Sequence, residues 1–197
     1  MCPLASATSD KFDPTAADYI RHAREANRIA GQILQLNMPE TERDVEELSG
    51  KFSLGLSLQA GELAGKAMLR SLGHTPQEIR DDHKRHDLPT LLDAVQDDAQ
   101  QRYDQGELVF EPFTDFMCTS IEIDGKPYRN TIGDYLHRHF SKGPSAFPRS
   151  YFYPDLPWFS APTPFHTLHK IVEDLIGIAE SLDKVAHSHV HPQGPNP

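Results

Sequence analysis

Four segments of this chain carry apolar residues at the three- and four-residue spacing of an amphipathic helix, and this pattern constrains the fold more than any other feature. The clearest segment runs from Ser49 to Leu72 and is followed by Gly73, a residue type that often terminates helices. The other three apolar stripes lie at 20–34, 88–99 and 165–182. Because each stripe needs a covering surface, the sequence predicts a mainly α protein built as a four-helix up-down bundle.

Capping signals predict where the helices begin. A capping residue is followed by proline at Asp13, Thr75 and Thr163, a combination typical of helix N-termini. Glu78 completes a capping box with Thr75, so a short helix is expected before the third apolar stripe. Asp87 is expected to cap the helix that carries this third stripe.

Small residues recur at every fourth position of the second predicted helix, at Ser57, Gly61 and Gly65. Such a groove lets the backbone of a neighbouring helix approach closely, although each glycine weakens the helix by about 1 kcal/mol relative to alanine. The sequence therefore predicts that this helix is central in the bundle.

Proline and β-forming residues mark a different kind of structure between the third and fourth long helices. Five of the sixteen prolines precede residue 100, whereas six lie between Pro144 and Pro164. The partly alternating stretch before Asp124-Gly125 predicts a small β-hairpin, and a short helix is expected at 131–140. We expect one helical-bundle domain over residues 13–186, with an insertion at 107–163. A disordered N-terminus at 1–12 and a disordered His- and Pro-rich tail at 187–197 are expected to flank it.

Charge and motif content exclude several classes of function. Nineteen Lys and Arg against twenty-nine Asp and Glu give a net charge of −10, so any contact with nucleic acid must be local. The sequence has no apolar run near the length of a membrane span and no signal peptide, which predicts a cytoplasmic protein without a membrane partner. It also has no phosphate-binding loop, dinucleotide-binding turn or zinc-protease motif, so no cofactor or metal is expected.

The stretch from Arg80 to Asp87 is the densest polar segment and the first candidate for chemistry. An arginine can hold a phosphate through its fixed fork of donors, and an imidazole can accept the proton of a ribose 2′-hydroxyl. Arg80 with His86 or His83 can thus in principle cleave RNA without a metal ion. The alternative is a solvated loop between two helices, with Lys84 and Arg85 as ordinary surface charges.

Glu62 and Lys66 lie four residues apart on the second predicted helix, away from the apolar stripe that contains Leu58 and Leu72. We expect them opposite the polar stretch, where Glu62 can orient a basic partner. The alternative is an exposed helical ion pair worth a few tenths of a kcal/mol.

Three short motifs together resemble the HEPN domain, whose name abbreviates higher eukaryotes and prokaryotes nucleotide-binding. They are Leu58-Gln59-Ala60-Gly61-Glu62-Leu63-Ala64-Gly65-Lys66-Ala67-Met68-Leu69, Gly73-His74, and His86-Asp87-Leu88-Pro89-Thr90-Leu91-Leu92. The resemblance covers roughly residues 14 to 105, with the helix from Pro164 as a fourth member. It implies a four-helix bundle that often dimerises. It also implies metal-independent RNA cleavage in some members, by an arginine and a histidine separated by roughly four to six residues, commonly in toxin–antitoxin and phage-defence systems.

The chain departs from that catalytic pattern in one respect. Arg80 and His86 have five residues between them, which fits the spacing, but they precede the third long helix, whereas active members usually carry the pair later. The later candidates, Arg129 and His137, have seven residues between them.

These observations predict a HEPN-like homodimer that binds or cleaves RNA, with RNA and an antitoxin or other protein as partners. We expect His86 to act as the catalytic base and Arg80 to stabilise the negative charge on the phosphate. The substrate-binding residues are expected to be Glu62, Lys66, His83, Lys84 and Arg85. The alternative function is a catalytically inactive helical scaffold that contacts another protein through the insertion at 107–163.

Overall fold

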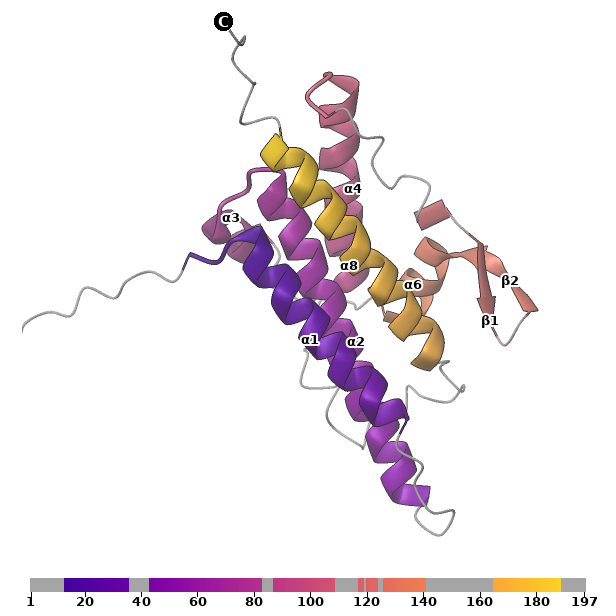
Figure 1. Cartoon of the computed structure of the whole chain (residues 1–197). Helices are drawn as coiled ribbons and strands as arrows, with labels where there is room; N and C mark the ends of the chain where they lie inside the picture. The colour runs from indigo at the N-terminus through magenta and orange to yellow at the C-terminus, as the bar shows by residue number, and fades with distance from the viewer. Residues whose placement is uncertain are drawn as a thin grey trace, which may run out of the picture.

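The computed structural model describes residues 13–35, 43–82, 87–108, 117–118, 120–123, 126–140 and 165–188, and this part of the chain is mainly helical (Figure 1). The elements are α1 (Ala16–Leu34), α2 (Arg43–Ser71), α3 (Pro76–Asp82), α4 (Leu88–Asp104), β1 (Ser120–Ile123), β2 (Lys126–Thr131), α6 (Ile132–Phe140) and α8 (Phe165–Ser188). None of the helices described combines the length and apolar character needed to cross a bilayer. The N-terminus expected to be disordered at 1–12 and the proline-rich stretch at 141–164 lie outside the described residues. Of the tail expected to be disordered at 187–197, residues 187 and 188 are the helical end of α8, and 189–197 lie outside the described residues.

Helix α1 begins with a capping box formed by Thr15 and Asp18. The Thr15 hydroxyl accepts a hydrogen bond from the Asp18 amide at 3.2 Å, and the Asp18 carboxylate accepts one from the Thr15 amide at 3.1 Å. The prediction of Asp13 as the cap is therefore wrong by two residues. The reciprocal box satisfies two backbone donors at once, whereas the Asp13 carboxylate lies 3.4 Å from a guanidinium nitrogen of Arg70 on α2.

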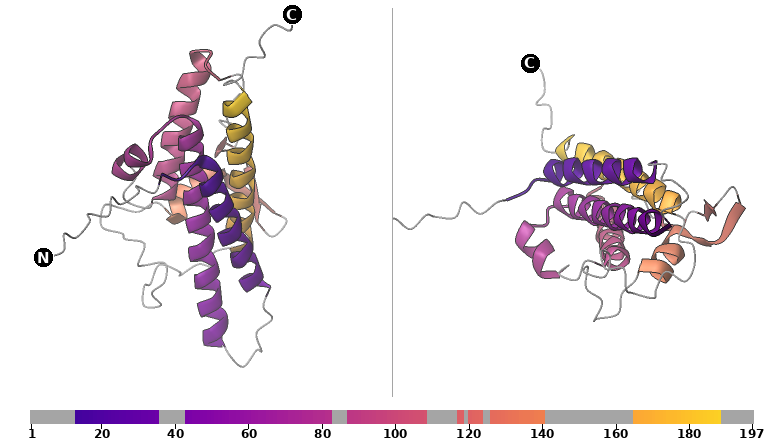
Figure 2. Two further views of the ribbon diagram at one scale, coloured as in Figure 1. Left: turned by 60° about the vertical axis from the view of Figure 1, so that its left-hand side comes forward. Right: turned by 90° about the horizontal axis from the view of Figure 1, so that it is seen from below.

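Helix α2 is central, as predicted, because α1, α4 and α8 all pack against it (Figure 2). Gly61 and Gly65 bring α4 close: a Cβ atom at Gly65 would lie 2.8 Å from Leu91 Cδ2, and one at Gly61 2.9 Å from Leu88 Cδ2. Ser57, the third residue of the predicted groove, instead lies against α1, where its hydroxyl donates to the Asn27 side-chain oxygen at 3.5 Å.

The directions of the helices differ from the predicted up-down order. Helix α1 is antiparallel to α2, since Ser53 donates to the carbonyl of Ala30 while Arg70 donates to that of Pro14. Helix α4, in contrast, runs parallel to α2, because Leu88 lies beside Gly61 and Asp98 beside His74 (Figure 1).

Helix α8 is also parallel to α2, since Val172 lies beside Gly61 and Asp183 accepts a hydrogen bond from Ser71. Three of the four long helices therefore point the same way. Between the end of α2 and the start of α4, the connection that contains α3 runs back along α2. Helix α4 therefore starts beside the middle of α2 and runs parallel to it, and the prediction of an up-down order is wrong.

The segment between α4 and α8 contains β1, β2 and α6. The two strands pair antiparallel, with Ser120 opposite Thr131 and Glu122 opposite Pro127. The predicted turn, Asp124-Gly125, lies outside the described residues. Helix α6 buries Tyr135, and the imidazole of His137 lies 2.9 Å from Asp93 of α4, which attaches this segment to the helical core.

Candidate functional site

The short helix α3 holds the one predicted catalytic residue that the structure describes. Gly73 adopts a φ of 94° and ends α2, and Pro76 opens α3 as the sequence predicts. The predicted capping box forms, since the Thr75 hydroxyl accepts from the Glu78 amide at 3.2 Å and the Glu78 carboxylate accepts from the Thr75 amide at 2.7 Å. These bonds to Thr75 lower the pKa of Glu78 below its usual value.

Arg80 lies exposed on α3, directly after Ile79, which is only 2% exposed and anchors the helix to the core. Successive residues of a helix are about 100° apart around its axis, so Arg80 projects along one flank of α3. Two acidic side chains of α3 contact other residues: Glu78 caps the N-terminus, and Asp81 accepts a hydrogen bond from Gln77 at 2.6 Å.

Glu62 is buried on α2, with 5% of its surface exposed, and Lys66 is half-buried one turn later. The alternative of an exposed helical ion pair is therefore wrong. Both residues directly follow a glycine that α4 approaches, so they lie about 100° around α2 from the α4 contact. Charged residues are rarely buried to this extent without a specific partner.

The start of α4 lies next to this part of α2. Asp87 is the N-cap, as predicted, and its carboxylate accepts a hydrogen bond from the Thr90 amide at 3.3 Å. The following residue, Leu88, packs on Gly61, so the chain enters α4 beside Glu62. The remaining predicted site residues immediately precede Asp87 in the sequence and lie outside the described residues; they are His83, Lys84, Arg85 and His86.

The structure adds two residues that the sequence analysis did not identify, Arg70 and Tyr19. The Arg70 guanidinium donates to the Pro14 carbonyl at 3.1 Å and to the His74 carbonyl at 2.6 Å, which joins the start of α1 to the chain that enters α3. Tyr19 is half-buried on α1, and burial raises the pKa of its phenol, while the positive charges of Arg70 and Arg80 lower it. No local motif marks either residue, because their proximity arises only when α1, α2 and α3 pack together.

We refer to Tyr19, Glu62, Lys66, Arg70 and Arg80, which lie on α1, α2 and α3, as the α3 corner; Glu62 and Arg70 are eight residues apart on α2, a rise of about 12 Å. A second polar cluster adjoins Arg70, because the imidazole Nε2 of His74, whose carbonyl accepts from Arg70, is 3.0 Å from Asp98 Oδ2. Asp98 is eleven residues beyond Asp87 on α4, a rise of about 16 Å, which separates this cluster from the entrance to α4.

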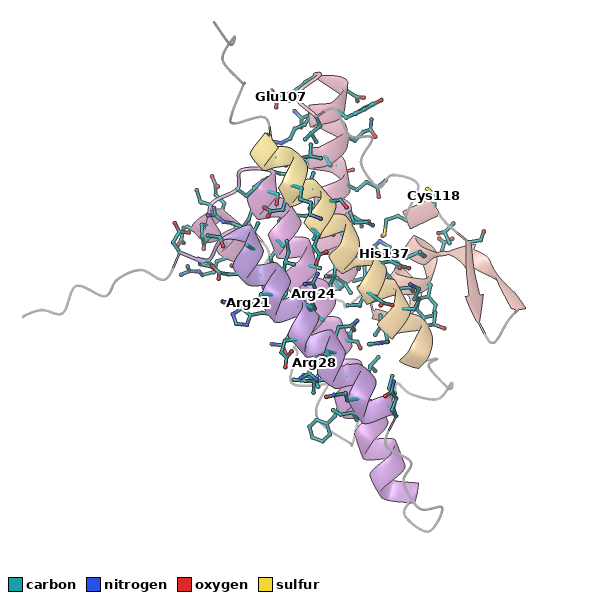
Figure 3. The ribbon with its side chains drawn as sticks, viewed as in Figure 1. Arg21, Arg24, Arg28, Glu107, Cys118 and His137 are labelled. Atoms are coloured by element: carbon teal, nitrogen blue, oxygen red, sulfur yellow. The ribbon has the colours of Figure 1, made fainter. Side chains whose placement is uncertain are left out.

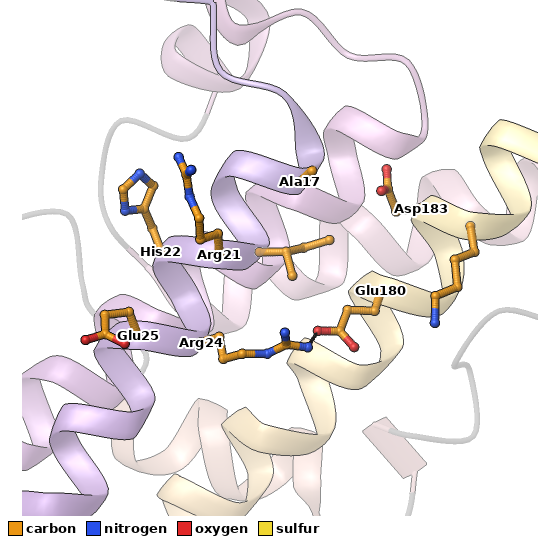
Figure 4. A pocket seen from close by; sticks show the side chains of 9 residues that line it. Ala17, Arg21, His22, Arg24, Glu25, Glu180 and Asp183 are labelled. Carbon is orange, nitrogen blue, oxygen red and sulfur yellow. Dashed lines mark hydrogen bonds and ion pairs between the residues drawn. The ribbon is translucent and has the colours of Figure 1, made fainter.

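A groove of about 620 Å³ lies between α1 and α8 (Figure 4). Its lining includes Ile20, and Arg24 of α1 forms an ion pair with Glu180 of α8. The exposed arginines along α1 are all paired with carboxylates, Arg21 with Asp18 and Arg28 with Glu25 in addition to the pair across the groove (Figure 3). This face is therefore close to electrically neutral.

The α3 corner offers polar groups of both kinds. Arg80 presents an exposed fork of donors, Tyr19 has a hydroxyl, and Glu62 has a buried carboxyl group near the start of α4. Comparison with protein-family models, curated proteins and solved structures found no match for this chain.

Proposed function

We propose that this protein is a HEPN-like four-helix protein that binds RNA at the α3 corner and cleaves it without a metal ion. The observation that carries this proposal is the arrangement around α3. Arg80 is exposed on a capped helix, and Leu88, at the start of α4, packs on Gly61, the residue before buried Glu62. An arginine, an imidazole and an orienting carboxylate are the groups that attack by a ribose 2′-hydroxyl requires.

In the proposed reaction, the 2′-oxygen forms a bond to phosphorus as the bond between phosphorus and the 5′-oxygen breaks. His86 accepts the proton of the 2′-hydroxyl, and the leaving 5′-oxygen takes a proton from solvent. Arg80 offsets the negative charge that develops on the phosphate. Glu62 orients the basic group, and Lys66, His83, Lys84 and Arg85 contact the neighbouring phosphates. The products are a 2′,3′-cyclic phosphate and a 5′-hydroxyl end.

RNA degradation in the presence of a chelator tests this proposal. We expect the wild-type protein to cleave, and Arg80→Ala, His86→Ala and the double variant each to lose about 10²- to 10⁴-fold in rate. Arg28→Ala is the matched control, because Arg28 is exposed on α1 nine residues beyond Tyr19, and it should cleave at the wild-type rate. Undiminished cleavage by the double variant would remove these two residues from the mechanism.

The resemblance also suggests the setting of the activity. We propose that the protein acts in the cytoplasm as a homodimer, in a toxin–antitoxin or phage-defence system, with an antitoxin as its protein partner. Expression of the wild-type chain should then arrest bacterial growth, and Arg80→Ala should relieve the arrest. Equal toxicity of the two proteins would contradict this setting.

A second candidate function is a catalytically inactive scaffold that contacts another protein through the insertion at 107–163. Two observations favour it, the net charge of −10 and the pairing of every exposed arginine described on α1 with a carboxylate. Removal of residues 142–162 should abolish partner binding in this case and leave RNA cleavage unaffected. Partner binding that survives this deletion in a folded protein would rule the scaffold function out.

A further inference from the structure

Each nitrogen of the Arg70 guanidinium, at the end of α2, contacts a neighbouring segment of the chain. Its Nε donates to the Pro14 carbonyl at 3.1 Å, one terminal nitrogen donates to the His74 carbonyl at 2.6 Å, and the other lies 3.4 Å from the Asp13 carboxylate. The side chain is only 20% exposed. Because its donors are directed at the chain itself, we expect Arg70 to act through the segments that it holds.

His74 is held at two points, its backbone and its side chain. The carbonyl that accepts from Arg70 belongs to the peptide bond between His74 and Thr75, the residue that caps α3. The imidazole Nε2 lies 3.0 Å from Asp98 Oδ2 on α4, and Arg102 donates to the same carboxylate at 3.2 Å. An ionised carboxylate only accepts, so the imidazole donates through Nε2. The chain that enters α3 is thereby attached to both α2 and α4.

The orientation of α3 depends on these two contacts of His74. Ile79 is 2% exposed and anchors α3 to the core, but one buried side chain fixes a point of a short helix and not the direction of its axis. The capping box between Thr75 and Glu78 joins the first turn of α3 to Thr75, so a displaced His74 would turn the whole seven-residue helix. Arg80 directly follows Ile79 and would turn with it. Because a guanidinium binds phosphate through a fixed fork, such a rotation would weaken binding.

We propose that Arg70 and Asp98 are positioning residues for Arg80, because together they hold His74 and so set the orientation of α3. That Arg80 contacts RNA rests on the proposed function, whereas the orientation of α3 rests on the contacts of His74. The alternative is that Arg70 and Asp98 contribute only to the stability of the fold.

Distances between spin labels test the orientation of α3 without RNA. The labels are attached at Arg80→Cys on α3 and Gln59→Cys on α2, in protein whose two native cysteines are replaced by serine. We expect a narrow distance distribution that broadens or shifts with Asp98→Ala. Asp97→Ala is the matched control, because Asp97 is the exposed neighbour of Asp98 on α4, and it should leave the distribution unchanged.

Arg70→Met is the second variant and should have the same effect on the label distances in protein that circular dichroism shows to be folded. If Arg70→Met does not fold, Asp98→Ala alone decides the test. A distribution that the folded variants leave unchanged overturns the proposal, whether or not the protein binds RNA.

A fluorescently labelled 2′-O-methyl oligoribonucleotide, which binds but cannot be cleaved, tests whether this orientation matters for RNA. Arg80→Ala should weaken its binding about 10- to 100-fold, the usual effect of losing a hydrogen bond to a charged group. Asp98→Ala should weaken binding by part of this factor, although the removal of a negative charge would by itself favour an anionic ligand. Asp97→Ala should bind at least as tightly as the wild type.

Combined variants separate positioning from a purely structural role. If Asp98 acts through Arg80, Asp98→Ala should cause no further loss of affinity in protein that already carries Arg80→Ala, while its effect on urea unfolding should persist. An equal loss of affinity in both backgrounds would overturn the positioning role. Wild-type affinity of Arg80→Ala would instead remove the proposed function, and the label distances would still decide what sets the orientation of α3.

Discussion

Gly65 shows how the absence of one side chain sets the distance between two helices. A Cβ atom at this position would lie 2.8 Å from Leu91 Cδ2 and 3.0 Å from Leu91 Cγ. Leu91 is 3% exposed and closely surrounded, so it cannot move aside at low cost. The spacing of small residues was sufficient to predict this close approach from the sequence, because it depends on one face of one helix.

Gly65→Ala should destabilise the protein although alanine favours helix formation. The matched control is Gly177→Ala on α8, where a Cβ atom would meet nothing within 4 Å and the variant should gain about 1 kcal/mol from helix propensity alone. Because both variants share this gain, their difference in unfolding free energy isolates the overpacking cost, about 1–3 kcal/mol. Urea denaturation measures it, and equal stability of the two variants would contradict the close α2–α4 packing.

The stability of helix α3 depends on the capping interactions at its ends, because a seven-residue helix is too short to be stable on its own. Its capping box was predictable because Thr75 and Glu78 are three residues apart and interact locally. The start of α1 was predicted wrongly because Asp13 and Thr15 are both good capping residues, and the choice between them depends on Arg70 from another helix. Local signals therefore locate a helix end only when no distant group competes for the cap.

Glu78→Gln should change how stability depends on acid pH. The hydrogen bonds from Thr75 hold the pKa of Glu78 below its unfolded value, so its carboxylate stabilises the folded state above about pH 4.5. This contribution is lost as the pH falls through the lowered pKa. The wild type should therefore be more stable than Glu78→Gln at pH 7, and the difference should shrink towards pH 3.

Urea unfolding of both proteins at pH 7 and pH 3 measures this difference. Gly177→Ala is the control, since the added methyl group meets nothing within 4 Å and no titrating group is removed, and its effect on stability should be the same at both pH values. A stability difference between wild type and Glu78→Gln that does not change with pH would contradict the role of the Glu78 charge.

Over the whole molecule, the sequence predicted which faces of the helices are buried but not the direction in which the helices run. An apolar stripe identifies the buried face of a helix and is the same whichever end comes first. Direction is set by connections, and short ones favour antiparallel neighbours. The sixteen residues from 72 to 87 form no short loop, since they include α3 and return the chain to the level of Gly61. The α3 corner was only partly predictable for the same reason: Arg80 and Glu62 belong to local motifs, whereas the charges of Arg70 and Arg80 act on Tyr19 only because α1, α2 and α3 pack together.

Distances between spin labels test this topology directly. Gln59 on α2 and Thr90 and Asp104 on α4 are exposed and suit labelling at introduced cysteines, after Cys2 and Cys118 are replaced by serine. With α2 and α4 parallel, the 59–104 distance should exceed the 59–90 distance by up to about 20 Å, the rise of fourteen helical residues. In an up-down bundle the order of the two distances would be reversed. That reversal would also move the start of α4 away from Glu62, so the same measurement tests the arrangement on which the proposed cleavage depends.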